Sequence, residues 1–182
     1  DGNSSDSPRL GGYEVDAGAW QPAAPVSVSP SSGSGDAQPF VVKFSDPYGS
    51  GDMAVLRVLS NGQQTAAHGC YVEVDVPHRT VSLADDGGQE WTTLPLGGSG
   101  TLQNNQCGVR AQSSGVTLNT TTATLTLDVT FTPAFAGTRS IWANLTDLRG
   151  DTSESPLLGV YTVTASAALG PMIRLLDEGF TM

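Results

Sequence analysis

Charged side chains are scarce in this chain of 182 residues, and basic ones are the scarcest, with 8 Lys and Arg against 18 Asp and Glu. Charged residues make up 14% of the sequence, compared with about 25% in typical globular chains. The net charge of −10 repels phosphate backbones and anionic lipid surfaces, so we expect no nucleic-acid partner. Ser, Thr, Gly, Asn and Gln must supply the polar surface, which suits an extracellular or cell-surface protein better than a cytosolic enzyme.

Long apolar runs are also missing from the sequence. No stretch of about 18 apolar residues occurs, so no membrane span is predicted. The sequence shows no signal peptide and begins with Asp1 rather than Met. We interpret this start as the processed N-terminus of a secreted protein, with a trimmed chain as the alternative.

Only two cysteines are present, Cys70 and Cys107. Neither belongs to a CxxC or CxxCH motif, which argues against zinc, redox and haem roles. The two residues would form a disulfide, half of a metal site, or two free thiols in the core. The secreted type of composition favours a Cys70–Cys107 disulfide. Closing the loop between them would stabilise the fold by about 3–4 kcal/mol.

Apolar and polar residues alternate clearly between residues 122 and 147. Leu125, Leu127 and Val129 occupy every second position of the first run, with Thr or Asp between them. A Pro- and Gly-containing turn at 132–137 separates this run from a second alternating run around residues 140–146. Such alternation predicts two antiparallel strands, each with one buried face and one Thr-rich outer face, as in an immunoglobulin-like β-sandwich.

The same reading over the whole chain predicts about nine short strands and no helix before residue 167. Turns follow one another about every 8–12 residues, as in β-sandwiches. We therefore expect an all-β, immunoglobulin- or fibronectin-III-like antiparallel sandwich over residues 25–166. The segment 30–35 is interpreted as a turn-rich loop, and Asn61-Gly62 as a hairpin turn. The nine strands are expected at 26–28, 40–44, 55–59, 71–76, 81–84, 102–109, 122–131, 138–147 and 159–164, and residues 90–94 would extend the sheet that holds 71–76 and 81–84.

Two terminal segments flank the expected sandwich. Residues 1–24 are rich in Gly, Ser, Asp and Pro, and their few apolar side chains recur with a period of two, which would form a strand only against a partner's edge. Residues 167–182 form an apolar tail that must dock on its own domain or on a neighbour. We expect contacts with a protein partner or a second copy of the chain. The residues predicted to make them are Leu10, Tyr13, Val15, Met172, Ile173, Leu175, Leu176 and Phe180.

Six segments together resemble an immunoglobulin-like repeat module of secreted and surface proteins from acidobacteria and related soil bacteria. The resemblance covers about residues 25–164 and implies a fold and a surface location, but no reaction. The chain departs from the family pattern because it holds a single copy and carries the unusual terminal segments. The segments that carry the resemblance are 26–35, 44–49, 69–71, 83–87, 102–107 and 131–137.

Calcium is the one cofactor that the sequence suggests. Asp46 and Asp52 flank a Gly-containing loop, and carboxylates on such loops suit this hard cation. The alternative is that these residues only form turns, as Asp-Pro and Asp-x-x-Gly sequences commonly do.

Two tryptophans, Trp91 and Trp142, are predicted glycan contacts, since exposed aromatic rings stack on sugars. Packing in the core or against a terminal segment is the alternative for both. Three N-x-[ST] sequons mark Asn3, Asn119 and Asn144 as candidate glycosylation sites.

Catalysis is not expected, because only His68 and His78 would serve as bases and no Gly-x-Ser-x-Gly motif is present. The leading hypothesis is a noncatalytic extracellular structural protein, a subunit of a surface filament or larger assembly held together by its terminal segments. The alternative is a carbohydrate-binding or adhesion module of a secreted protein, with calcium as its candidate cofactor.

Overall fold

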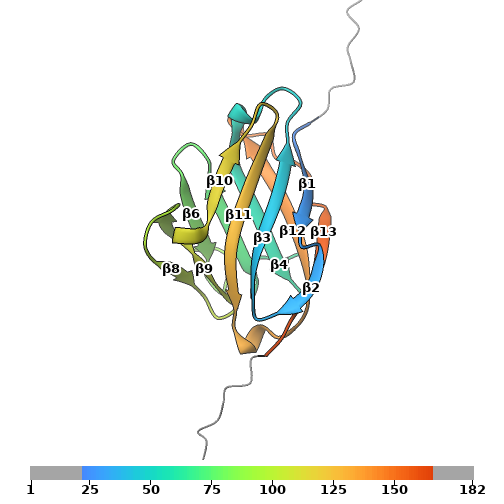
Figure 1. Ribbon diagram of the computed structural model, residues 1–182, viewed down its shortest axis with the longest axis vertical. Helices are drawn as coiled ribbons and strands as arrows, with labels where there is room; N and C mark the ends of the chain where they lie inside the picture. Colours follow the sequence, from blue (N-terminus) through green and yellow to red (C-terminus); the bar gives the residue numbers. More distant parts are fainter. Residues whose placement is uncertain (1–21, 166–182) are drawn as a thin grey trace, which may run out of the picture.

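The computed structural model describes residues 22–165, which form two β-sheets packed face to face (Figure 1). This part of the chain contains thirteen strands and three single-turn 3-10 segments, so it is an all-β sandwich as expected. The predicted assembly residues Leu10 to Val15 and Met172 to Phe180, and the sequon at Asn3, lie outside the described residues.

One sheet has six strands, all paired antiparallel. Their order is β1–β3–β11–β9–β8, and β10 lies beside part of β11. The bounds are β1 (Ala24–Ser29), β3 (Ala37–Ser45), β8 (Thr101–Gln103), β9 (Cys107–Arg110), β10 (Gly115–Leu118) and β11 (Thr122–Phe131).

The other sheet has seven strands in the order β2–β13–β12–β4–β5–β6–β7. All neighbours are antiparallel except β2 and β13, which run parallel. The bounds are β2 (Ser32–Gly35), β4 (Met53–Asn61), β5 (Cys70–Asp75), β6 (Thr80–Ala84), β7 (Trp91–Pro95), β12 (Gly137–Asp147) and β13 (Leu157–Val163).

The alternation that predicted strands at 122–131 and 138–147 is confirmed. In β11 every second residue is buried, and in β12 Ile141, Ala143 and Leu145 are buried while the residues between them are half-exposed. The two strands belong to opposite sheets, so their apolar faces meet across the core. The turn between them contains the 3-10 segment Pro133–Phe135, whose Phe135 also packs into the core.

An aromatic cluster fills the end of the core beneath β2. The Tyr161 ring centroid lies 5.3 Å from that of Phe40 and 6.0 Å from that of Phe131. Phe135 extends the cluster by stacking on Phe131 at 5.9 Å. Edge-to-face and offset arrangements of this kind favour the ring quadrupoles and join both sheets at one place.

The prediction that residues 30–35 form only a loop is wrong, since Ser32–Gly35 is strand β2. This strand pairs with β13 from Ser32 opposite Val160 to Gly35 opposite Val163. Its glycines allow the backbone to lie directly on Tyr161: a Cβ atom on Gly33 would be 3.1 Å from the ring edge. A Gly/Ser segment therefore forms a strand here because the neighbouring side chain supplies the packing.

The hairpin turn expected at Asn61-Gly62 is also wrong, because the connection from β4 to β5 extends to residue 69. The Asn61 side-chain nitrogen donates hydrogen bonds to the carbonyls of Thr65 and Ala67, at 2.8 and 3.1 Å. These bonds fold the connection into a compact loop. The strand expected at 102–109 is likewise two strands, β8 and β9, which turn at Asn104.

The first and last described strands lead to opposite poles of the sandwich. Ala24, at the start of β1, pairs with Ser45 at the end of β3, whereas Val163, at the end of β13, pairs with Gly137 at the start of β12. Figure 1 shows the two ends of the coloured ribbon at the top and bottom of the molecule. We call the pole at the start of β1, where the loops 46–52, 119–121 and 147–152 meet, the upper pole.

Candidate functional site

An aromatic row crosses the outer face of the seven-stranded sheet. Trp142 on β12 pairs with Leu59 on β4, which in turn pairs with Tyr71 on β5. The Tyr71 ring lies 5.2 Å from the ring of Trp91, on the edge strand β7. The structure thus places both predicted glycan contacts, Trp91 and Trp142, on one face and joins them through Leu59 and Tyr71. We call these four residues the aromatic strip.

Tyr71 was missed by the sequence reading, although the alternation in β5 points to it. Val72 and Val74 are buried, so Tyr71 and Glu73 must face the other side of the strand, and both are half-exposed. Partial burial raises the pKa of the Tyr71 phenol, with Arg57 opposing and Glu73 reinforcing the shift. The hydroxyl therefore keeps its proton at neutral pH and can donate a hydrogen bond.

A polar row runs beside the aromatic strip on the same face, two residues along each strand. The Arg57 Nε atom donates to Glu73 at 2.7 Å, and another guanidinium nitrogen donates to the Thr146 hydroxyl at 2.8 Å. Further along, the hydroxyls of Ser82 and Thr93 are 2.8 Å apart. The row consists of Asn144, Arg57, Glu73, Ser82 and Thr93, paired in that order across β12, β4, β5, β6 and β7.

A pocket of about 210 Å³ opens where the two rows begin. Trp142, Tyr71 and Leu59 line it from the strip, and Arg57 and Asn144 line it from the polar row. Its rim is built by two loops, which Gln64 joins by donating to the Ser155 carbonyl at 3.0 Å. The Asn144 Oδ1 atom has no hydrogen-bond partner among residues 22–165. A half-open pocket of this type, with aromatic walls and a few polar groups, is a common ligand-site geometry.

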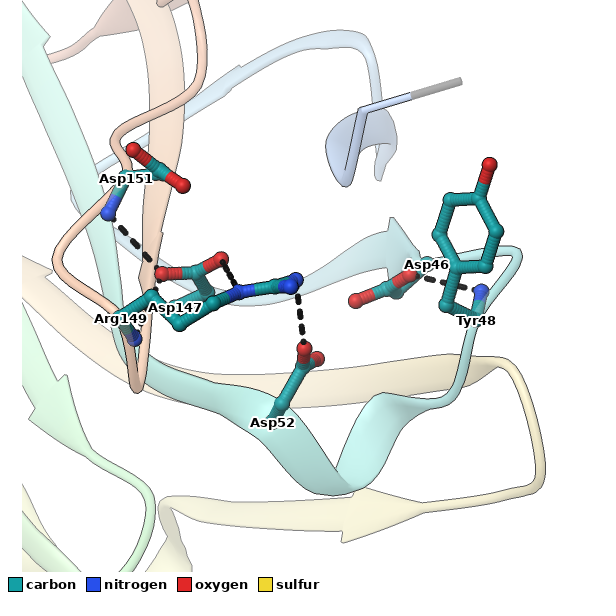
Figure 2. Close-up of polar contacts among 6 residues, drawn as sticks. All are labelled: Asp46, Tyr48, Asp52, Asp147, Arg149 and Asp151. Carbon is teal, nitrogen blue, oxygen red and sulfur yellow. Dashed lines mark hydrogen bonds and ion pairs between the residues drawn. The ribbon is translucent and has the colours of Figure 1, made fainter. Parts of the chain in front are cut away.

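The predicted metal-binding residues, Asp46 and Asp52, meet at the upper pole with Asp147, Arg149 and Asp151 (Figure 2). Arg149 lies between two of the carboxylates, at 3.3 Å from Asp52 and 3.3 Å from Asp147. Asp46 is buried and accepts the Tyr48 backbone N–H at 2.8 Å. These contacts tie the loop between β3 and β4 to the loop between β12 and β13, which is a structural role.

Hydrogen bonds and burial shift the pKa values of two carboxyl groups in this cluster, those of Asp52 and Asp147. A side-chain hydrogen bond with Asp46, followed by burial, raises the pKa of Asp52 despite the attraction of Arg149. Burial also disfavours the charged form of Asp147, but the backbone N–H groups of Asp151 and Arg149 outweigh it and lower the pKa of Asp147.

The carboxylates at the upper pole already have a cation among them, the Arg149 guanidinium. Within residues 22–165 no group of three or more His, Cys, Asp or Glu side chains has the arrangement of a metal site. Calcium binding by Asp46 and Asp52 stays a prediction, and an incoming ion would have to displace Arg149 from Asp52.

We expect Asp52→Asn to raise the melting temperature at pH 7. A carboxyl whose pKa is raised by folding destabilises the folded state above that pKa, and this effect disappears as the pH falls toward the ordinary value of 3.8. The increase in melting temperature of the variant over the parent chain should therefore become smaller as the pH falls from 7 to about 4. Melting curves of the variant, the parent chain and Asp151→Asn as a control would measure it. A variant less stable than the parent at pH 7 would contradict the assignment.

The predicted disulfide is confirmed: Cys70 and Cys107 are bonded, with their Cα atoms 5.7 Å apart. Both residues are buried. Cys70 begins β5 in the seven-stranded sheet and Cys107 begins β9 in the six-stranded sheet, so the bond links the two layers near the short strands β8 and β9.

The two sequons inside the described residues differ in accessibility. Asn119 is exposed on the turn between β10 and β11. Asn144 is half-buried in the pocket wall, and its Oδ1 atom is shielded from solvent. Glycosylation stays a prediction, and the exposed Asn119 side chain is the better placed of the two.

The described part of the chain includes no helix of sufficient length and apolar character to span a membrane. Comparison with protein-family models, curated proteins and solved structures finds no match for this chain.

Proposed function

We propose that the chain is a noncatalytic structural module of an extracellular assembly and that its two terminal segments join it to its neighbours. The observation that carries this proposal is where the described sandwich begins and ends. Strand β1 starts at the upper pole and strand β13 ends at the opposite pole (Figure 1). Segments 1–21 and 166–182 are therefore attached at opposite ends of a rigid body, which favours head-to-tail contacts between copies.

The strand arrangement supports an immunoglobulin-like module. Strand β1 pairs with β3 in one sheet, and β2, only two residues further on, moves to the other sheet and pairs in parallel with the last strand β13. The chain thus changes sheets between β1 and β2, and later connections also cross between the sheets. This pattern is typical of Greek-key sandwiches, which are widely used in cell-surface proteins. The resemblance to the acidobacterial repeat module remains part of this proposal.

The disulfide supports an extracellular location. Disulfides persist in oxidising compartments and are rare where thiols are kept reduced. The bond between Cys70 and Cys107 is buried between the sheets, so it contributes to the fold. The scarcity of charge over the whole sequence agrees with this location, because a neutral polar surface tolerates dense packing.

The sequences of the terminal segments supply the proposed contacts. Tyr13 and Val15 belong to a period-two pattern that suits a strand added to the open edge of a neighbour. The apolar residues from Met172 to Phe180 would dock across the same joint and bury apolar area. Because the contact joins two different surfaces, it repeats from copy to copy and builds a filament rather than a closed dimer.

Deleting residues 1–21 or 166–182 should abolish assembly while leaving the sandwich folded, since both sheets and the core cluster described here are built by residues within 22–165. Negative-stain microscopy and sedimentation of each deletion, beside the full chain, would measure the effect. Circular dichroism and melting curves control for folding. A folded chain that lacks both segments and still polymerises would contradict the proposal.

A further inference from the structure

We propose that the outer face of the seven-stranded sheet binds a neutral oligosaccharide, which lies along the aromatic strip with one sugar in the pocket beside Trp142. This site is built by the described sandwich and does not depend on assembly through the terminal segments.

The rings are placed where a sugar would reach them. Trp142 and Tyr71 are half-exposed and line the pocket from two different strands, β12 and β5. Trp91 is 39% exposed at the sheet edge and leans on Tyr71. Leu59 lies between them on β4 but belongs to the outer face and not to the main core cluster. Large amphipathic rings that remain on a polar surface are better explained by a ligand than by packing.

Hydrogen-bonding groups accompany the rings along their whole length. Asn144 provides a carboxamide in the pocket wall. The protonated Tyr71 hydroxyl, the Gln64 and Thr65 side chains at the rim and the Ser82–Thr93 hydroxyl pair offer further donors and acceptors. An apolar strip beside a polar row matches a ligand with an apolar ring face and hydroxyls at its edge.

The charge of the site selects a neutral ligand. Arg57 is the one cationic residue that lines the pocket, and Glu73 neutralises it at 2.7 Å. The same guanidinium is held by Thr146, so it is not free to turn toward an acidic group. With no unpaired cation in the pocket and a chain charge of −10, acidic sugars, phosphates and anionic peptides are disfavoured.

The length of the strip favours a chain of sugars over a single one. From β12 to β7 the strip crosses five adjacent strands, which spans about 19 Å at the usual spacing between strands. The pocket of about 210 Å³ at one end is small. Affinity should therefore increase as sugars are added, because successive residues reach Tyr71 and then Trp91.

Isothermal titration of the full chain with four neutral probes tests the proposal: cellohexaose, xylohexaose, laminarihexaose and N-acetylchitohexaose. We expect at least one to bind, and its dimer to bind more weakly. Trp142→Ala and Trp91→Ala should each weaken binding by about tenfold or more. Tyr48→Ala removes an aromatic ring that is exposed outside the strip, so it serves as the matched control and should bind like the parent.

Three results would overturn the proposal. The first is that none of the neutral probes binds the full chain, or that a hexamer of galacturonic acid alone binds. The second is that Trp91→Ala, a substitution at the exposed sheet edge that should keep the fold, and a folded Trp142→Ala both bind like the parent. The third is that binding appears only after the terminal segments are deleted, which would mean that the chain itself covers the strip.

Discussion

Replacing both cysteines with alanine should lower the free energy of unfolding by about 4 kcal/mol, as expected for a bond that closes a loop of this size. The two cysteines are separated by 37 positions in sequence. The bond reduces the number of conformations open to the unfolded chain. In the folded chain it joins β5 to β9 across the sandwich. In the same region β9 pairs with β11 at three positions, and the Asn104 side chain donates to the carbonyls of Gly69 and Ala84 at 3.1 and 2.9 Å.

Urea unfolding of the Cys70→Ala/Cys107→Ala chain and the parent measures this loss. The parent in the presence of a thiol-free reductant provides the control, because it should approach the variant once the bond opens. Hydrogen exchange should accelerate most in β8 and β9, the strands that the bond ties to β5 of the opposite sheet. A loss below about 1 kcal/mol would contradict the stabilising role, given the usual range for native disulfides.

Tyr161→Ala should destabilise the fold by about 3–5 kcal/mol, the usual cost of removing a large aromatic ring from a packed core. Tyr161 is 2% exposed and contacts both Phe40 and Phe131. It also supports β2, whose Gly33 lies on the edge of the ring. The substitution would therefore leave a cavity and remove the surface on which β2 packs.

Tyr48→Ala is the matched control for this substitution, because the Tyr48 side chain is 62% exposed at the upper pole. Exposed substitutions of this kind change stability by about 0.5 kcal/mol or less. Chemical unfolding of both variants should separate them clearly. Similar losses of unfolding free energy for the two variants would mean that the aromatic cluster beneath β2 does not stabilise the fold as proposed.

Period-two patterns explain how much of the fold could be read from the sequence. Strands β11 and β12 were predicted almost residue for residue, because one face of each packs into the core and the other is polar. Strand β2 could not be predicted in this way, since Ser and Gly show no apolar alternation. What makes it a strand is Tyr161, which lies more than a hundred positions later in the chain.

The two surface sites show the same limit. Asp46 and Asp52 lie on one loop and could be considered together from the sequence, but Arg149 reaches Asp52 from a loop almost a hundred residues away. Trp91 and Trp142 were each predicted as glycan contacts, with packing in the core or against a terminal segment as the alternative, but their common row depends on strand register, which pairs Trp142 with Leu59 and Leu59 with Tyr71. Local patterns predict which way a side chain faces, whereas strand order decides which side chains meet.

Light scattering combined with negative-stain microscopy of the full chain at micromolar concentration tests the central claim most directly. Assembly through segments at opposite poles predicts a mass that increases with concentration and linear particles with a repeat of one sandwich. A single species with the mass of one 18.8 kDa chain at every concentration would contradict self-assembly through the terminal segments.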